Sequence, residues 1–393
     1  MKKLFLTSMA FLAMMSAMTL TSCSDDDNGG GDGPGPTDSA VLGGDVEGTL
    51  TLDANTEYHL TSALIVREGA TLEIPAGTTI KAAKGFGNYI LVERGGKINA
   101  TGTAAKPIIM TADATDATSG HWGGLIINGY APISGPGGTV SEGATEINTN
   151  TFYGGDKADD NSGTIEYVQL LYTGARSSAD IEHNGLTLNG VGNGTQIDHI
   201  YVLESADDAI EFFGGSVNVT NLLAVNPDDD MFDFTQGYNG ELKDCYGIWE
   251  DGYTSTEEDP RGIEADGNLD GKNPEHTPQS DFKVTNMTID LQLANNSNDG
   301  YYMHDVVKVR RGAKATVTNA LVKGQGACKD IIDLKDDKGN ADTATSISLT
   351  NSNTGARIND GKDINGEGYA SVKIEDGNTG CSSSIFGWTG YEI

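Results

Sequence analysis

Positive charge is scarce in this sequence of 393 residues, which holds 25 lysines and arginines against 57 aspartates and glutamates. The resulting net charge of −32 repels the phosphates of nucleic acids and anionic lipid headgroups. We therefore expect no nucleic-acid partner, and we expect metal cations or uncharged molecules as ligands.

Proline and cysteine are also scarce, at 10 and 4 residues. Cys245 is expected to be a buried free thiol, and Cys328 and Cys381 would pair only if the C-terminal segment folds back. The histidines are scattered and form neither an H-x-x-x-H pair nor a Ser-His-Asp signature, although the members of a triad can be distant in sequence. Cysteine and histidine therefore indicate no metal site or catalytic triad.

Long apolar runs are missing except for residues 4–20, which follow Lys2 and Lys3. This run is too short for a stable membrane-spanning helix, and small residues separate it from Cys23, as in a bacterial lipoprotein signal. We expect residues 1–22 to be removed and Cys23 to be lipidated, which would attach the protein to the outer membrane. The alternative is an ordinary secretory signal with a chance cysteine.

Residues 24–27, with the sequence SDDD, resemble the acidic tag that directs Bacteroidota lipoproteins to the cell surface. They could also simply begin the tether, since residues 29–40 lack the apolar side chains needed to fold. We assign residues 23–40 to a lipidated flexible tether, residues 41–365 to one folded domain and residues 366–393 to a C-terminal cap.

Glycine is abundant, at 53 residues, and the chain carries a repeat of about two dozen residues. Its first part is a short strand with apolar side chains facing inward and a polar side chain between them facing outward. The outward positions are Thr187, Glu211, Asp233, Glu264, Lys308 and Asp333.

The second part of the repeat places apolar residues at positions one, four and six, with Asn or Asp at position three in most copies. A flat strand would need positions one, three and five, so we expect a bend at Asn221, Asn286 and Asn319. Leu222, Met287 and Ala320 should then point into one shared core. Three short strands per coil predict a triangular solenoid, in which the aromatic C-terminal segment covers the last strand edges. These features resemble a right-handed parallel β-helix.

These repeats resemble the pectate-lyase-like superfamily. The stretches HWGGLIINGYAPI (121–133), YGGDKADDNSGTIEYVQLLYTGA (153–175), NGLTLNGVGNGT (184–195) and RGIEADGN (261–268) are similar to β-helical surface lipoproteins of Bacteroidota. In pectate lyases the outer face of this strand family carries calcium and a basic catalytic residue. Here no arginine follows the acidic residues at the expected place.

Two groups of residues are candidates for a calcium site. Glu211, Asp233 and Glu264 would stack at coil spacing, and like charges this close either raise their pKa values or attract a cation. Asp266, Asn268 and Asp270 lie within an acidic insert at about residues 248–280, in a D-x-N-x-D-G spacing typical of calcium loops, although Thr277 stands where an EF-hand has glutamate. A solvated acidic face is the alternative.

Trp249 and Tyr253, in the same insert, are expected to line a glycan-binding lip, or alternatively to form a solvated flap. Because the expected catalytic arginine is missing, we favour a non-enzymatic surface lipoprotein that binds a glycan or a partner protein such as an outer-membrane importer. A calcium-dependent polysaccharide lyase or another glycan-active enzyme is the first alternative. A structural adhesin is the second, because the fold alone does not decide the function.

Overall fold

The computed structural model describes residues 38–137, 141–178, 181–358, 364–365 and 368–393. The expected signal peptide, Cys23 and most of the tether lie outside these residues. Within the described part, no helix has the length and apolar character of a membrane span.

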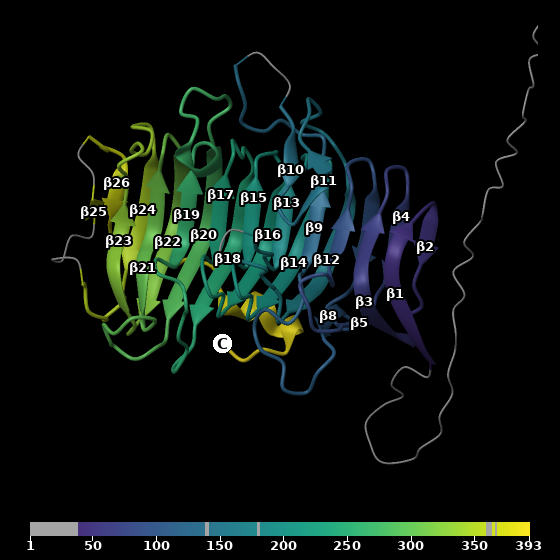
Figure 1. Ribbon diagram of the computed structural model, residues 1–393. Helices are drawn as coiled ribbons and strands as arrows, with labels where there is room; N and C mark the ends of the chain where they lie inside the picture. Colours follow the sequence, from purple (N-terminus) through teal and green to yellow (C-terminus); the bar gives the residue numbers. More distant parts are fainter. Residues whose placement is uncertain (1–37, 138–140, 179–180, 359–363, 366–367) are drawn as a thin grey trace, which may run out of the picture.

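The domain is a parallel β-helix, as the repeats predict, and its strands stack into one elongated body (Figure 1). Each coil contributes to three sheets, which we call A, B and C. Sheet C consists mainly of short strands, namely β6 (Ile90–Val92), β9 (Leu125–Asn128), β13 (Leu186–Asn189), β15 (Ile210–Phe213), β17 (Phe232–Thr235), β19 (Arg261–Asp266), β21 (Tyr302–Arg310), β23 (Ala327–Asp333) and β25 (Ile364–Asn365).

Sheets A and B share long strands that bend in the middle. The bent strands are β12 (Gly163–Leu171), β14 (Gln196–Leu203), β16 (Asn218–Val225), β18 (Glu241–Trp249), β20 (Asp281–Leu291) and β22 (Lys314–Gly324). In the first coils, β2 (Thr49–Thr51), β4 (Thr71–Pro75) and β7 (Lys97–Thr101) begin sheet A, whereas β5 (Thr79–Ala82) and β8 (Ile108–Ala112) lie in sheet B.

The remaining parallel strands lie at the two ends of the solenoid. At the N-terminal end, β1 (Asp38–Val46) pairs with β3 (Thr56–Val66), which in turn pairs with β5 and β6. At the other end, β24 (Ser346–Asn351) follows β22 and pairs with β26 (Val372–Ile374). An antiparallel hairpin of β10 (Gly143–Thr145) and β11 (Asn148–Tyr153) stands apart from this ladder.

The bends confirm the predicted corners. Asn221, Asn286 and Asn319 have φ values of 56°, 56° and 53°, in the left-handed region that asparagine tolerates better than most residues. Their amides form a ladder: Asn286 donates to Asp244 Oδ1 at 2.7 Å, and Asn319 donates to Asn286 Oδ1 at 2.8 Å. The ladder gives hydrogen-bond partners to the side-chain amides at the corner, which would otherwise be unpaired.

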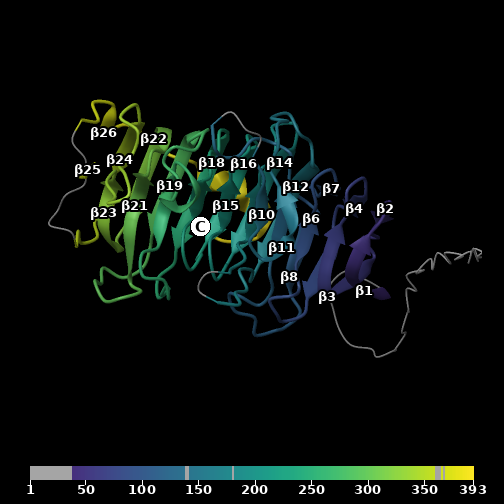
Figure 2. The same ribbon diagram turned by 45° about the horizontal axis from the view of Figure 1, so that its top comes forward.

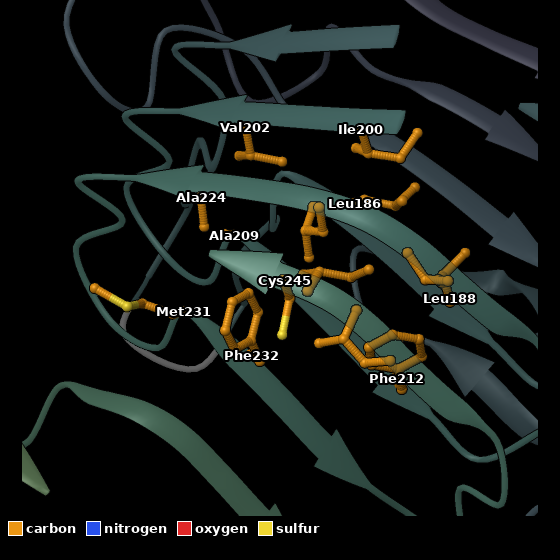
Figure 3. Close-up of a cluster of buried hydrophobic side chains, with 14 of the residues drawn as sticks. Leu186, Leu188, Ile200, Val202, Ala209, Phe212, Ala224, Met231, Phe232 and Cys245 are labelled. Carbon is orange, nitrogen blue, oxygen red and sulfur yellow. The ribbon is translucent and has the colours of Figure 1, made fainter. Parts of the chain in front are cut away.

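The predicted core is confirmed as well. Leu222, Met287 and Ala320 are fully buried in one continuous apolar interior. Figure 3 shows how equivalent side chains of successive coils, such as Leu188 and Phe212 or Val202 and Ala224, lie near one another in it. Full burial of such side chains stabilises the fold by about 1.5–3 kcal/mol each.

Only the first part of the C-terminal segment lies at the last strand edges, where β26 pairs with β24; its aromatic part does not lie there, contrary to our expectation. Its 3₁₀ helix η2 (Ser383–Thr389) packs across the outer face of sheet B, behind the middle coils (Figures 1 and 2). Phe386 and Cys381 cover Leu223 and Tyr246 there, and the Cys381 backbone N–H donates to Thr288 Oγ1 at 3.0 Å. The aromatic part of the segment buries apolar side chains against the outer face of sheet B and not against the open end of the solenoid.

The three described cysteines are buried, and Cys245 and Cys381 are free thiols. Cys245 lies in the core, as expected. Cys328 belongs to β23 of sheet C, whereas Cys381 lies against sheet B, so the segment that folds back does not bring these two thiols together.

Candidate functional site

The outward side chains of sheet C form the predicted column. Backbone pairing places Glu211 beside Asp233, and Asp233 beside Glu264. Because neighbouring strands lie about 4.8 Å apart, the carboxyl groups of consecutive coils are close together.

A second row of carboxylates, missed in the sequence analysis, lies in the turns just before these strands. Asp208 Oδ1 accepts a hydrogen bond from the backbone N–H of Asp230 at 2.9 Å, and Asp230 Oδ1 accepts one from the backbone N–H of Arg261 at 2.7 Å. Each carboxylate therefore holds the backbone turn of the next coil in place and still lies next to the outward column of sheet C. The aspartate pairs 207–208 and 229–230, one repeat apart, were the available signal.

Charge pairing divides this face into two parts. On the C-terminal side, Glu264 binds both Arg261 and Arg310, and Asp333 binds Lys308 at 2.5 Å. Arginines therefore do contact the column, although the sequence did not place them at the expected position. Glu264 and Asp333 are thus neutralised by basic residues of the protein itself.

The other part, which we call the carboxyl cluster, comprises Asp207, Asp208, Glu211, Asp229, Asp230 and Asp233. Burial is the main cause of raised pKa values throughout this cluster, and neighbouring carboxylates add to it. Burial raises the pKa of Asp229 to about 7 and that of Asp233 to about 8. Without a counter-charge, these groups retain protons near neutral pH.

The carboxyl cluster has the ligands that a hard cation needs. One oxygen from each of Asp208, Glu211 and Asp233 lies within 4.8 Å of the other two, and Asp207, Asp208 and Asp229 form a second such group. One buried oxygen of Asp229 and one of Asp233, Oδ1 in both cases, accept no hydrogen bond. Calcium binds six to eight oxygens at about 2.3–2.6 Å, so the cluster could hold such an ion after small side-chain movements.

The D-x-N-x-D-G segment does not converge on one point. Asp266 binds Arg310 at 2.8 Å and Arg311 at 2.6 Å, and the amide of Asn268 is buried, where its Oδ1 accepts the backbone N–H of Asn273. The carboxylate of Asp270 pairs with Lys272 at the surface. Of the six predicted metal ligands, the structure places only Glu211 and Asp233 in one cluster of carboxyl groups that form no salt bridge with the described residues, although the nearby Arg261 and Arg310 lower the pKa of Asp233.

Trp249 and Tyr253 do not form an open lip. Trp249 is fully buried, and its indole N–H donates to the Pro227 carbonyl at 3.1 Å. The Tyr253 hydroxyl donates to the same carbonyl at 2.8 Å. These aromatic rings anchor the base of the insert, so Trp249 is not available to stack on a sugar ring.

A pocket of about 450 Å³ lies against the N-terminal end of the carboxyl cluster. Thr187, Asn189, Glu211 and Phe213 of β13 and β15 contribute to it, and the β10–β11 hairpin borders it. Its other lining residues are Ile126, Ala144, Thr145, Glu146, Ile147, Tyr153, Glu182, His183, Asn184, Leu269, Asp270 and Lys272. Glu211 thus belongs both to the pocket and to the carboxyl cluster.

Sequence reasoning missed this pocket because its border is not part of the repeat. The hairpin and residues 269–272 come from segments far apart in the chain, and only the fold brings them to β13 and β15. A pocket of this volume is within the range of sites for small ligands.

Two solved structures show distant similarity to this chain. The first is the catalytic domain of a GH87 alpha-1,3-glucanase in complex with tetrasaccharides, with 11% identity, a TM-score of 0.31, and coverage of 82% of this chain and 64% of that domain. The second is an alginate lyase from Paenibacillus sp. str. FPU-7, with 13% identity, a TM-score of 0.28, and coverage of 80% and 99%. The chain thus spans less than two thirds of the glucanase domain.

Comparison with curated protein sequences gives no match. A family profile does match, and it covers residues 44–390, which include every strand of sheet C. By this match the chain belongs to the family of pectate-lyase-like β-helix domains.

Proposed function

We propose that this protein is a lipoprotein, anchored through Cys23 at the outer face of the outer membrane, whose β-helix binds a glycan beside a divalent cation. The signal-like N-terminus and the SDDD stretch support the location. The strong negative charge is consistent with an uncharged ligand and a cation.

One observation carries the functional part of the proposal: the carboxyl cluster, whose members form no salt bridge with the described residues, adjoins a pocket of small-ligand size at Glu211. A cation in the cluster would remove the repulsion among its carboxylates and hold Glu211 in a fixed orientation at the edge of the pocket. The polar pocket wall, together with Tyr153 and Phe213, offers both hydrogen bonds and apolar ring contacts to a sugar.

Two measurements test this function. Calorimetry with calcium on the full-length protein should give binding that Asp233→Asn weakens at least tenfold, while Asp281→Asn, in the surface pair with Lys314, leaves it unchanged. A glycan array, read with calcium and with a chelator, should then give calcium-dependent binding of at least one oligosaccharide. An array without any glycan binding would refute the proposal.

The second candidate function is glycan cleavage, and the raised pKa values of Asp229 and Asp233 favour it. Carboxyl groups that retain a proton near pH 7 can act as general acids. One oxygen from each of Asp208, Glu211 and Asp233 lies within 4.8 Å of the other two, which is closer than the roughly 6.5–9.5 Å between the two carboxyl groups of inverting glycosidases and nearer to the roughly 5–5.5 Å of retaining ones. Assays for new reducing ends and for unsaturated uronate products would separate hydrolysis and elimination from binding alone.

A further inference from the structure

The carboxyl cluster contains two groups of three oxygens that share one residue. Asp208, Glu211 and Asp233 contribute one oxygen each to the first group, which reaches the pocket through Glu211. Asp207, Asp208 and Asp229 contribute one oxygen each to the second group. The three oxygens of each group lie within 4.8 Å of one another. Oxygens that bind one calcium ion are at most about 5.2 Å apart, because each lies about 2.3–2.6 Å from the ion, so each group can bind one ion.

Each group also contains a residue with a buried oxygen that lacks a hydrogen-bond donor. These atoms are Oδ1 of Asp233 for the first group and Oδ1 of Asp229 for the second. Buried polar atoms in folded proteins nearly always have a partner, so an unpaired one indicates a water or an ion. Asp207, Glu211, Asp229 and Asp233 are all partly exposed, so an ion can reach both groups from solvent.

Arg176 lies near the second group but does not neutralise it. Its positive charge opposes the rise in the pKa of Asp207. However, its guanidinium is shared by three other carboxylates, with N–O distances of 3.2 Å to Glu182, 3.6 Å to Asp228 and 2.5 Å to Glu257. One positive charge cannot balance these three partners and Asp207 as well.

Arg261 is shared in the same way. Its positive charge opposes the rise in the pKa of Asp229. Its guanidinium, however, pairs with the carboxylates of Asp259, Glu264 and Asp305. The two arginines therefore leave net negative charge on the second group.

A single ion in the first group would not bind the second. The two groups share only Asp208, so an ion held by the first group leaves Asp207 and Asp229 without a cation. Asp207 lies in the turn before β15 and Asp229 in the turn before β17, and the pairing of these strands brings the two carboxylates together. A second ion would thus join the turns of two neighbouring coils.

We infer that the carboxyl cluster binds two divalent cations with Asp208 as their shared ligand: one beside the pocket with Glu211 and Asp233, and a second with Asp207 and Asp229. This inference rests on the proposed cation binding and adds a second ion to it. Asp207, Asp208 and Asp229 are not among the described residues that line the pocket, so the second ion does not contact a ligand there. Its role is to hold the two turns, and with them the shared Asp208, in place.

Equilibrium dialysis of the full-length protein counts the bound calcium ions. Calcium is raised to about 10 mM, because extracellular calcium modules have dissociation constants of about 10⁻⁴–10⁻³ M. Salt at about 0.15 M removes ions that the net charge of −32 attracts loosely. The native protein should bind two ions, and so should the control Asp281→Asn, which changes only a surface pair with Lys314.

Two variants assign the ions to the two groups. Asp229→Asn and Asp233→Asn, which keep the shape of the side chain, should each weaken one of the two ions at least tenfold, and the double variant should weaken both. Two ions of native affinity in either single variant would overturn the inference. One ion in the native protein would also overturn it, and the proposed function would survive if Asp233→Asn removed that ion. No bound ion would refute both.

A measurement on the native protein tests the shared ligand and does not depend on the folding of any variant. Carboxylate sites also accept Mn²⁺, and the two ions of two-metal sites lie about 3.5–4 Å apart. With two Mn²⁺ ions per protein, electron paramagnetic resonance should show spin coupling between them. A spectrum of isolated ions at this ratio would overturn the assignment of Asp208 as the shared ligand, and with it the inference.

Discussion

The carboxyl cluster should make folding stability depend on pH in a way that calcium suppresses. A carboxyl group whose pKa rises on folding binds more protons in the folded than in the unfolded state, so its contribution to stability is lost as pH rises. For Asp233, whose pKa rises from 3.8 to about 8, the loss extends over this interval. The other members of the cluster have raised pKa values and act in the same direction.

The expected effect is large enough to measure. One pKa unit corresponds to about 1.36 kcal/mol, so Asp233 alone accounts for a loss on the order of 5 kcal/mol between pH 4 and pH 9 in the absence of a cation. Calcium at a hundredfold excess over its dissociation constant would restore about 2.7 kcal/mol. For a chain of this length, each kcal/mol corresponds to roughly 1–2 °C in melting temperature.

Thermal unfolding at several pH values from 5 to 8, with calcium or with a chelator, measures this linkage. The melting temperature in chelator should fall as pH rises, and calcium should raise it most at pH 8. Asp233→Asn, which keeps the shape of the side chain but removes one ionisable group, should flatten the pH dependence and reduce the calcium response by at least half.

Asp270→Asn is the matched control, because Asp270 lies at the surface with Lys272 and should change stability by less than about 1 kcal/mol. The reasoning would be refuted by equal melting temperatures at pH 5 and pH 8 in chelator, together with no response to millimolar calcium. The carboxylates would then be ionised and solvated without any cation.

Three further changes test the fold and the anchor. Asn286→Ala removes two ladder hydrogen bonds at a left-handed corner and should cost about 2–4 kcal/mol in urea unfolding, and Asn286→Gly should cost less. Leu222→Ala opens a cavity in the fully buried core and should cost about 2–5 kcal/mol by the same measurement. Cys23→Ser should abolish acyl labelling and membrane retention, so a variant that still fractionates with membranes after a salt wash would argue against the lipid anchor.

The coil was predictable because its information is local. Val219, two residues before Asn221, and Leu222, directly after it, are both apolar, a spacing that a flat strand does not give. The same pattern recurs at Asn286 and Asn319. Any single copy would be ambiguous, but stacked copies must present the same face to the core. The column of Glu211 and Asp233 followed from this register.

The partners of the charged and aromatic side chains were not predictable, because they come from other coils. Arg310 reaches Glu264 from 46 residues away and Arg311 reaches Asp266 from 45, which prevents the D-x-N-x-D-G segment from acting as a calcium loop. The orientation of the buried His183 ring depends on a contact with the Phe86 carbonyl, 97 residues earlier. Aromatic residues near the C-terminus indicated an apolar contact, but nothing local indicated which sheet would receive it.

The C-terminal segment changes how this solenoid should unfold. In a repeat protein, each coil contacts mainly its neighbours, so unfolding can begin at either end and spread. Here Gln169 donates to the Thr389 carbonyl across 220 residues of sequence, and the Tyr391 hydroxyl donates to Glu250 at 2.6 Å across 141. The last residues of the chain thus bind its middle coils. Their detachment would expose the apolar outer face of sheet B at the centre of the solenoid, and unfolding would then start there.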